Sequence, residues 1–188
     1  MSERNTLKRN LTIALFAALM AAGAFIRVPI GPVPITLTTF FLLLSALLLG
    51  PAAGSLSVLI YLIIGTAGIP VFAGGSGPAV FAGPTGGFLI AYIPAALACG
   101  FISHNSAAIG KIRFPYRDIL AVIAGSLVLY AVGVPWLKLR LGLEWNQALS
   151  AGMLPFLPGD ALKAAAAIAV RLTLVKRAPE LLPLRGKK

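Results

Sequence analysis

The chain has 188 residues, of which 59% are hydrophobic and only 11% are charged. Soluble domains carry roughly 25% charged residues, so this composition, with a mean hydropathy of +0.93, excludes an ordinary soluble fold and indicates an integral membrane protein. The net charge of +11 does not point to nucleic acid, because the basic residues gather at the termini and in one loop without interleaved aromatic residues.

Six apolar segments approach the length of about 20 residues that a helix needs to cross a bilayer. Stretches rich in glycine and proline, which interrupt helices, separate most of them. The sequence therefore predicts an all-α fold, a bundle of six transmembrane helices in a single membrane domain covering residues 1–188. The expected spans are residues 11–26, 35–49, 52–68, 86–102, 118–134 and 158–175.

The first apolar segment also has the features of a signal peptide. Arg4, Lys8 and Arg9 precede it, and small residues around Ala22 end it. Because five further apolar segments follow, we expect this segment to be retained as the first helix.

Basic residues fall mainly on one side of the predicted bundle. The opposite side has only Arg27, Lys138 and Arg140. The positive-inside rule then places both termini in the cytoplasm, which requires an even number of spans. The eleven basic residues on the cytoplasmic side are Arg4, Lys8, Arg9, Lys111, Arg113, Arg117, Lys176, Arg177, Arg185, Lys187 and Lys188.

Three irregular segments, residues 27–34, 69–85 and 135–157, lie on the non-cytoplasmic side in this topology. Backbone groups outside regular structure cannot rest unpaired in hydrocarbon, so these segments sit in water, pack on protein or line a cavity. Together they predict a lidded pocket at that end of the bundle.

Asp160 and Lys163 are the least expected residues of the sixth span. Their separation of three residues puts them on one helix face, and ionisable residues inside a membrane are costly enough to suggest a function. The pair offers an acceptor and a cationic donor to a ligand with amide-like groups. Alternatively, Asp160 stabilises the helix amino terminus after Pro158 and Lys163 extends outward to water.

Residues 83–87, Gly-Pro-Thr-Gly-Gly, lead into the fourth span. Their amide groups at a helix amino terminus could hold a carboxylate; alternatively, they are turn residues. No Gly-Lys-Ser/Thr follows, so the segment is not a nucleotide P-loop, and any ATP hydrolysis requires another chain.

Ala14, Ala18 and Ala22 recur every four residues in the first span. Small residues at this spacing let another helix approach closely, either a partner's helix or one of the same bundle.

An enzyme would need a nucleophile and a base in contact. Ser76 and the single histidine, His104, are predicted at opposite faces of the membrane, roughly 30 Å apart. The single cysteine, Cys99, lies in an apolar segment, so we expect no metal site and no disulfide.

Several motifs, in order over about residues 25–170, resemble those of the BioY family, the substrate-binding (S) components of energy-coupling-factor (ECF) biotin transporters. They are GPVPITLTT at 31–39, LGP at 49–51, GIPVFAGG at 68–75, FAGPTGGF at 81–88, GVPW at 133–136, and LPFLPGD at 154–160 with Lys163.

The resemblance implies a six-helix protein of the prokaryotic cell membrane that binds biotin near the outer face. Transport would require a transmembrane scaffold subunit and ATP-binding-cassette ATPase subunits, with biotin as substrate and no cofactor or metal. It implies that Asp160 and Lys163 contact the polar head of biotin and that Ala14, Ala18 and Ala22 face the scaffold. The further residues expected at the biotin site are Thr36, Phe81, Thr85, Gly86, Gly87, Tyr92 and Trp136.

Three other functions remain open from the residues alone. The chain could bind another small vitamin as an S component, work alone as a carrier, or, least favoured by the Ser76–His104 separation, act as an intramembrane enzyme.

Overall fold

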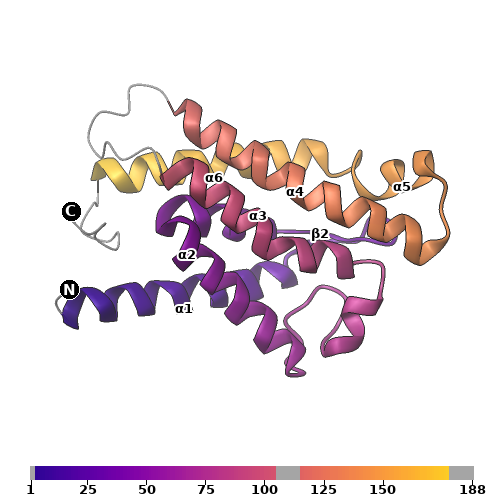
Figure 1. The fold of residues 1–188 in the computed structure, drawn as a ribbon, viewed down its shortest axis with the longest axis horizontal. Coiled ribbons are helices and arrows are strands. Elements are labelled where there is room, and N and C mark those ends of the chain that lie inside the picture. Colours follow the sequence, from indigo (N-terminus) through magenta and orange to yellow (C-terminus); the bar gives the residue numbers. More distant parts are fainter. Residues whose placement is uncertain (1–2, 105–114, 178–188) are drawn as a thin grey trace.

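The computed structural model describes residues 3–104 and 115–177, and its long elements are all α-helices (Figure 1). The shorter elements are two paired strands and one 3-10 helix. In chain order they are α1 Glu3–Phe25, β1 Arg27–Val28, β2 Ile35–Thr36, α2 Thr38–Thr66, η1 Pro78–Ala82, α3 Gly86–His104, α4 Tyr116–Leu141, α5 Trp145–Gly152 and α6 Leu157–Arg177.

The long element α2 reverses direction at Gly50. This glycine has φ 79° and ψ −174°, a conformation that favours glycine, and Pro51 follows it without an amide donor. A Cβ atom on Gly54 would lie 2.8 Å from the Cα of Ala46, whereas residues eight apart in a straight helix are about 12 Å apart. The chain therefore folds back on itself there, with residues 46 and 54 in contact across the turn, which agrees with the predicted break between the spans 35–49 and 52–68.

Four of the described helices are long and apolar enough to cross a membrane: α1 from Asn5, α2, α3 and α4. The pair α5 and α6, bent by 44°, meets the same criteria when taken together, which gives up to five candidate spans. This count treats α2 as one element, although its two halves run in opposite directions.

Some predicted boundaries were wrong. Ile35 and Thr36 form β2, paired antiparallel with β1, so the helix begins only at Thr38. The predicted fifth span corresponds to α4, which continues through Pro135 to Leu141. It ends where Gly142 adopts the left-handed conformation, a common helix stop. The expected irregular segment 135–157 is thus largely helical, in the end of α4 and in α5.

The centre of the bundle is α3, which packs against both α2 and α4, whereas α1 and α6 pack mainly on α2. Its buried face consists mostly of small residues, among them Ala95 and Cys99, both 0% exposed. A Cβ on Gly125 of α4 would lie 3.2 Å from the Cβ of Cys99. Small side chains let these helices approach closely, as is usual inside membranes.

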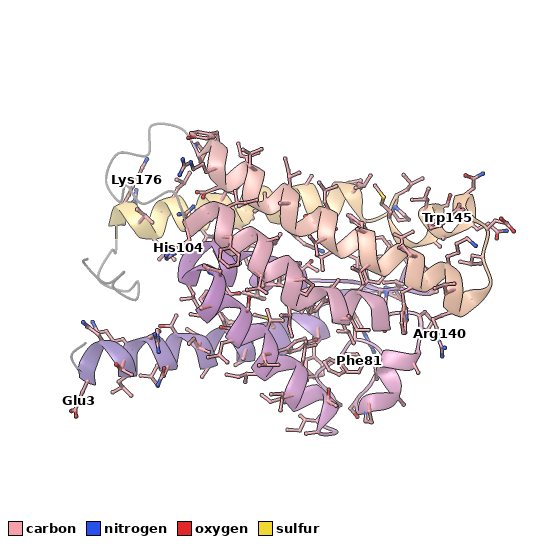
Figure 2. All side chains as sticks on the ribbon, viewed as in Figure 1. Glu3, Phe81, His104, Arg140, Trp145 and Lys176 are labelled. Atoms are coloured by element: carbon pink, nitrogen blue, oxygen red, sulfur yellow. The ribbon has the colours of Figure 1, made fainter. Side chains whose placement is uncertain are left out.

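The two ends of the bundle are occupied by different parts of the chain. Glu3, His104 and Lys176 lie at one end of the long axis, and Phe81 and Trp145 lie at the other (Figure 2). The loops after α1 and after α2, together with α5, lie at the second end (Figure 1). Lys111 and Arg113, and the basic residues after Arg177, fall outside the described residues.

Candidate functional site

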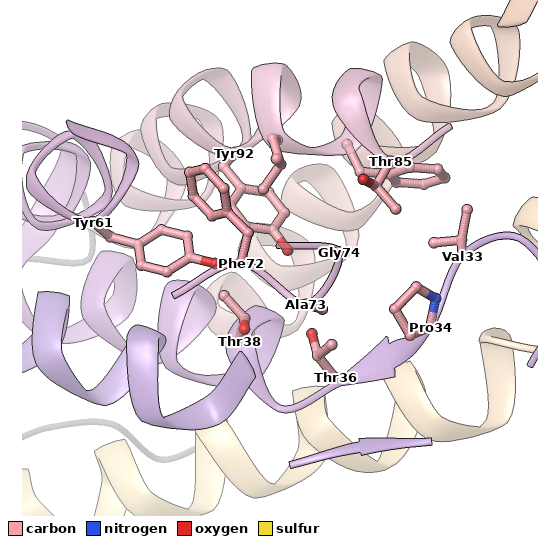
Figure 3. A pocket seen from close by; sticks show the side chains of 12 residues that line it. Val33, Pro34, Thr36, Thr38, Tyr61, Phe72, Ala73, Gly74, Thr85 and Tyr92 are labelled. Carbon is pink, nitrogen blue, oxygen red and sulfur yellow. The ribbon is translucent and has the colours of Figure 1, made fainter. Parts of the chain in front are cut away.

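Two adjoining cavities of about 40 and 60 Å³ lie at the end of the bundle that carries Phe81. They share five lining residues and are called the end pocket below. Figure 3 shows the first cavity, with the side chains of Thr36, Thr38 and Tyr92 directed into a common space. The shared residues are Val33, Pro34, Thr36, Phe88 and Tyr92.

Asp160 and Lys163 form the polar wall of the end pocket. The Lys163 ammonium lies 3.0 Å from Asp160 Oδ1 and donates a hydrogen bond to Thr39 Oγ1 at 3.1 Å. The Tyr130 hydroxyl donates to the other Asp160 oxygen, Oδ2. The Lys163 side chain is only 11% exposed, so it lies against the pocket instead of extending outward to water.

Aromatic side chains form a large part of the remaining walls. Phe88, Tyr92 and Phe156 line the cavity beside Asp160, and Tyr61 stacks on Tyr92 with 6.4 Å between ring centroids. Small-molecule pockets typically combine apolar walls with a few placed polar groups that orient the ligand. The arrangement suits a small ligand with a hydrogen-bonding head and an apolar body.

The loop between α2 and α3 is folded down over the end pocket. The Phe72 ring fills the space above Gly65, where a Cβ would lie 2.2 Å from Phe72 Cζ. Tyr61 donates to the Val71 carbonyl at 3.2 Å. The Arg27 guanidinium donates to the Ala73 carbonyl, which joins this loop to the strand after α1. Two of the three predicted loops thus close the pocket together.

Five of the seven other predicted biotin-site residues fall into two groups. Thr36, Thr85 and Tyr92 line the cavities. Phe81 and Trp136 lie behind the lining: the Phe81 ring packs edge-on against Phe72, with centroids 5.9 Å apart, and Trp136 Nε1 donates to the Gly83 carbonyl at 3.0 Å.

Gly86 and Gly87 are not among the residues that line the two cavities. A Cβ on Gly86 would lie 1.9 Å from the Phe81 carbonyl oxygen, and one on Gly87 would lie 2.2 Å from Trp136 Cβ. The Gly86 amide donates to the Gly83 carbonyl at 3.1 Å. Close packing accounts for both glycines, and carboxylate binding at this helix end stays a prediction.

Sequence reasoning missed Tyr130, Thr39, Phe88 and Phe156 as pocket residues. Tyr130 carried a usable signal, because a phenol in the middle of an apolar span needs a hydrogen-bond partner. In the structure that partner is Asp160.

Ala14, Ala18 and Ala22 are exposed on α1, whereas Phe16 and Ala17 are buried. The packing of α1 within the bundle is mainly against α2. The three-alanine face therefore points away from the bundle and is free for another helix.

Ser76 lies in the loop before α3, and His104 is the last residue of that helix. The 19 residues of that helix separate them, so they do not form a catalytic pair. Across residues 3–104 and 115–177, no group of three or more His, Cys, Asp or Glu side chains could hold a metal ion.

The fold and the end pocket define a class of protein: a multi-pass helical membrane protein with a small-molecule pocket at one end. The family model described as the BioY family matches residues 1–180, and the chain belongs to this family.

Known relatives and one solved structure agree with this assignment. The chain is 46% identical over 159 residues to the "Probable biotin transporter BioY" of Pyrococcus horikoshii, covering 84% of this chain and 90% of that protein. It is 36% identical over 171 residues to the "Biotin transporter BioY" of Thermotoga maritima, covering 90% and 97%. The crystal structure at 2.1 Å of the S-component for biotin from an ECF-type ABC transporter matches with a TM-score of 0.87 and 28% identity, covering 95% and 96%.

Proposed function

We propose that this protein captures biotin in the end pocket for ATP-driven uptake by an ECF module. The observation that carries the proposal is the Asp160–Lys163 pair, held in an aromatic pocket of a fold that matches a biotin S component. The cyclic urea of biotin has two N–H donors and one carbonyl acceptor. Asp160 can accept from an N–H group and Lys163 can donate to the carbonyl, and charge-assisted hydrogen bonds of this kind are strong.

Binding requires movement of the lid, which is formed by the loop after α1 and the loop between α2 and α3. Ligand pockets are usually about 300–1,000 Å³, whereas the two cavities measure about 40 and 60 Å³. The loops that carry Arg27 and Ala73 close the pocket through one hydrogen bond, so they are the parts that must separate to admit biotin.

The proposed topology has six crossings, both termini in the cytoplasm and the end pocket facing outward, in the membrane of a prokaryotic cell. In this proposal α2 crosses twice, which the reversal at Gly50 supports, and α6 is the last crossing. Glu3 and Lys176 lie at the same end of the bundle, and the distribution of basic residues favours that end as the cytoplasmic one. Residues 1–188 then form a single membrane domain.

The proposed partners are a transmembrane scaffold subunit and separate ATPase subunits. The exposed face of Ala14, Ala18 and Ala22 on α1 supports a close helix–helix contact with the scaffold. In this proposal the chain needs no cofactor of its own, and biotin is only its transported substrate.

Native mass spectrometry of the detergent-purified protein tests the proposal. We expect a bound mass equal to that of biotin, displaced when desthiobiotin is added in excess, because desthiobiotin keeps the urea group. A different vitamin in the pocket would support the other S-component function, and a protein that retains no added biotin would contradict the proposal.

A further inference from the structure

A second polar cluster lies at the end of the bundle opposite the end pocket. Arg171 of α6 forms an ion pair with Asp118 of α4, and both side chains are buried, at 5% and 2% exposure. Ser103 of α3 donates to Asp118 Oδ1 at 3.3 Å. The pair therefore joins α6 to the centre of the bundle, and the proposed binding reaction leaves it without a role.

Between the polar contacts at its two ends, α6 offers little to fix its rotation. Its buried residues are Ala167 and Arg171, and residues 164–167 are four consecutive alanines. It packs mainly on α2 and only sparsely on α4, and an apolar groove of about 250 Å³ separates α4 from α6. A surface of alanines has nearly the same shape after a shift of one residue, which turns the helix by about 100°.

Arg171 lies on the same helical stripe as the ligand-site residues. The spacings from Asp160 to Lys163, Ala167 and Arg171 are three, four and four residues, which keeps them on one face. Asp160 and Arg171 are about 16 Å apart along the helix. At the end pocket, Tyr130 of α4 contacts Asp160 of α6. At the opposite end of the bundle, Asp118 of α4 contacts Arg171 of α6.

We infer that Asp118 and Arg171 are positioning residues: their ion pair sets the rotation and height of α6, so that Asp160 and Lys163 face the end pocket. The identity of the ligand in this inference rests on the proposed function. A buried ion pair often adds little stability compared with a well-packed apolar pair, and its best-attested role is to specify register. Stability and position can therefore be separated by experiment.

The variant that separates them is Asp118→Leu/Arg171→Met, which replaces the ion pair by apolar side chains. We expect a Tm close to that of the wild type, but a biotin affinity at least tenfold weaker. The charge-retaining pair Asp118→Glu/Arg171→Lys should restore most of that affinity. The matched control is Lys176→Met, which removes a basic residue from the exposed surface of the same helix and should leave both values unchanged.

The position of α6 can be measured without any ligand. In a Cys99→Ala background, nitroxide labels can be attached at Leu139 of α4 and Leu162 of α6, which are 76% and 73% exposed. The distance between the two unpaired electrons then reports the rotation of α6. A one-residue turn moves the label on the order of 8 Å, and we expect such a shift in the apolar variant alone. If wild-type protein does not bind biotin, the proposed function is wrong. The distance between the two labels still tests whether the ion pair sets the rotation of α6.

Three outcomes would overturn the inference: wild-type affinity in the apolar variant, an unchanged label distance, or affinity that falls only in proportion to Tm. If the apolar variant does not fold, Asp118→Asn/Arg171→Gln provides a neutral hydrogen-bonding pair with the same expectations. Failure of both variants to fold would make the ion pair a purely structural element and would also overturn the inference.

Discussion

Tyr130 on α4 donates a hydrogen bond to Asp160 on α6, and Lys163 contacts the other oxygen of the same carboxylate. Both Asp160 oxygens are thus oriented by protein groups before a ligand enters. Such preorganisation lowers the ordering cost of binding. The ligand needs only to use the remaining lone pairs of a carboxylate that is already in place.

Tyr130→Phe tests this arrangement, because it removes the hydroxyl donor and keeps the ring. A net hydrogen bond contributes about 0.5–1.5 kcal/mol, so we expect biotin affinity to fall about three- to tenfold by calorimetry. Tyr116→Phe changes an exposed tyrosine at the first turn of the same helix and should have no effect. Equal affinity in both variants would mean that Asp160 does not depend on Tyr130.

Arg27→Ala tests the lid. The variant loses the hydrogen bond from Arg27 to the Ala73 carbonyl, so the two loops should separate more often. We expect biotin to dissociate about two- to fivefold faster, as one exposed hydrogen bond is lost, with the measurement made by chasing bound labelled biotin. Lys138→Ala removes a basic residue from the same end of the bundle and should leave the dissociation rate unchanged. An unchanged or slower dissociation rate in Arg27→Ala would contradict the role of these two loops as a lid.

Ala18→Trp tests the scaffold surface. Ala18 is exposed on α1, so the bulky ring should leave the bundle and biotin binding intact while it blocks the close approach of a partner helix. We expect normal calorimetry but no co-purification with the scaffold and no biotin uptake in cells. Ala131→Trp, at an exposed position of α4, is the control that should retain uptake. Loss of biotin binding in Ala18→Trp would place the partner surface on another helix.

Part of this site could be predicted from local sequence patterns. The three-residue spacing put Asp160 and Lys163 on one face, and Gly50 with Pro51 separated the predicted spans 35–49 and 52–68, because both features depend on neighbours along the chain. The contact of Lys163 with Thr39 spans 124 residues and that of Tyr130 with Asp160 spans 30. Such contacts depend on how helices pack, which spacing alone does not specify.

The wrong boundaries have a similar explanation. Ile35 begins an apolar run, which predicts a helix. In the structure it pairs with Val28 in a two-stranded hairpin, and hydropathy contains no information on such pairing. Pro135 predicted a helix end, yet α4 continues to Leu141. Membrane helices tolerate proline when neighbouring elements satisfy the freed backbone groups.

Ser76→Cys in a Cys99→Ala background tests the topology. Ser76 lies in the loop that closes the end pocket, so the new thiol should react with a membrane-impermeant reagent in intact cells. The buried Cys99 is replaced so that it cannot contribute a signal. Reaction only after lysis would place the end pocket on the cytoplasmic side and would exclude capture from outside the cell.

The most direct measurement is calorimetric titration of biotin into the wild-type protein and into Asp160→Asn. The substitution turns one acceptor oxygen into a donor at the centre of the pocket without changing its size. Hydrogen bonds to a charged group contribute about 1.5–3 kcal/mol, so we predict tight binding by the wild type and roughly ten- to a hundredfold weaker binding by Asp160→Asn. Equal affinities, or no binding by the wild type, would contradict a biotin site built on Asp160.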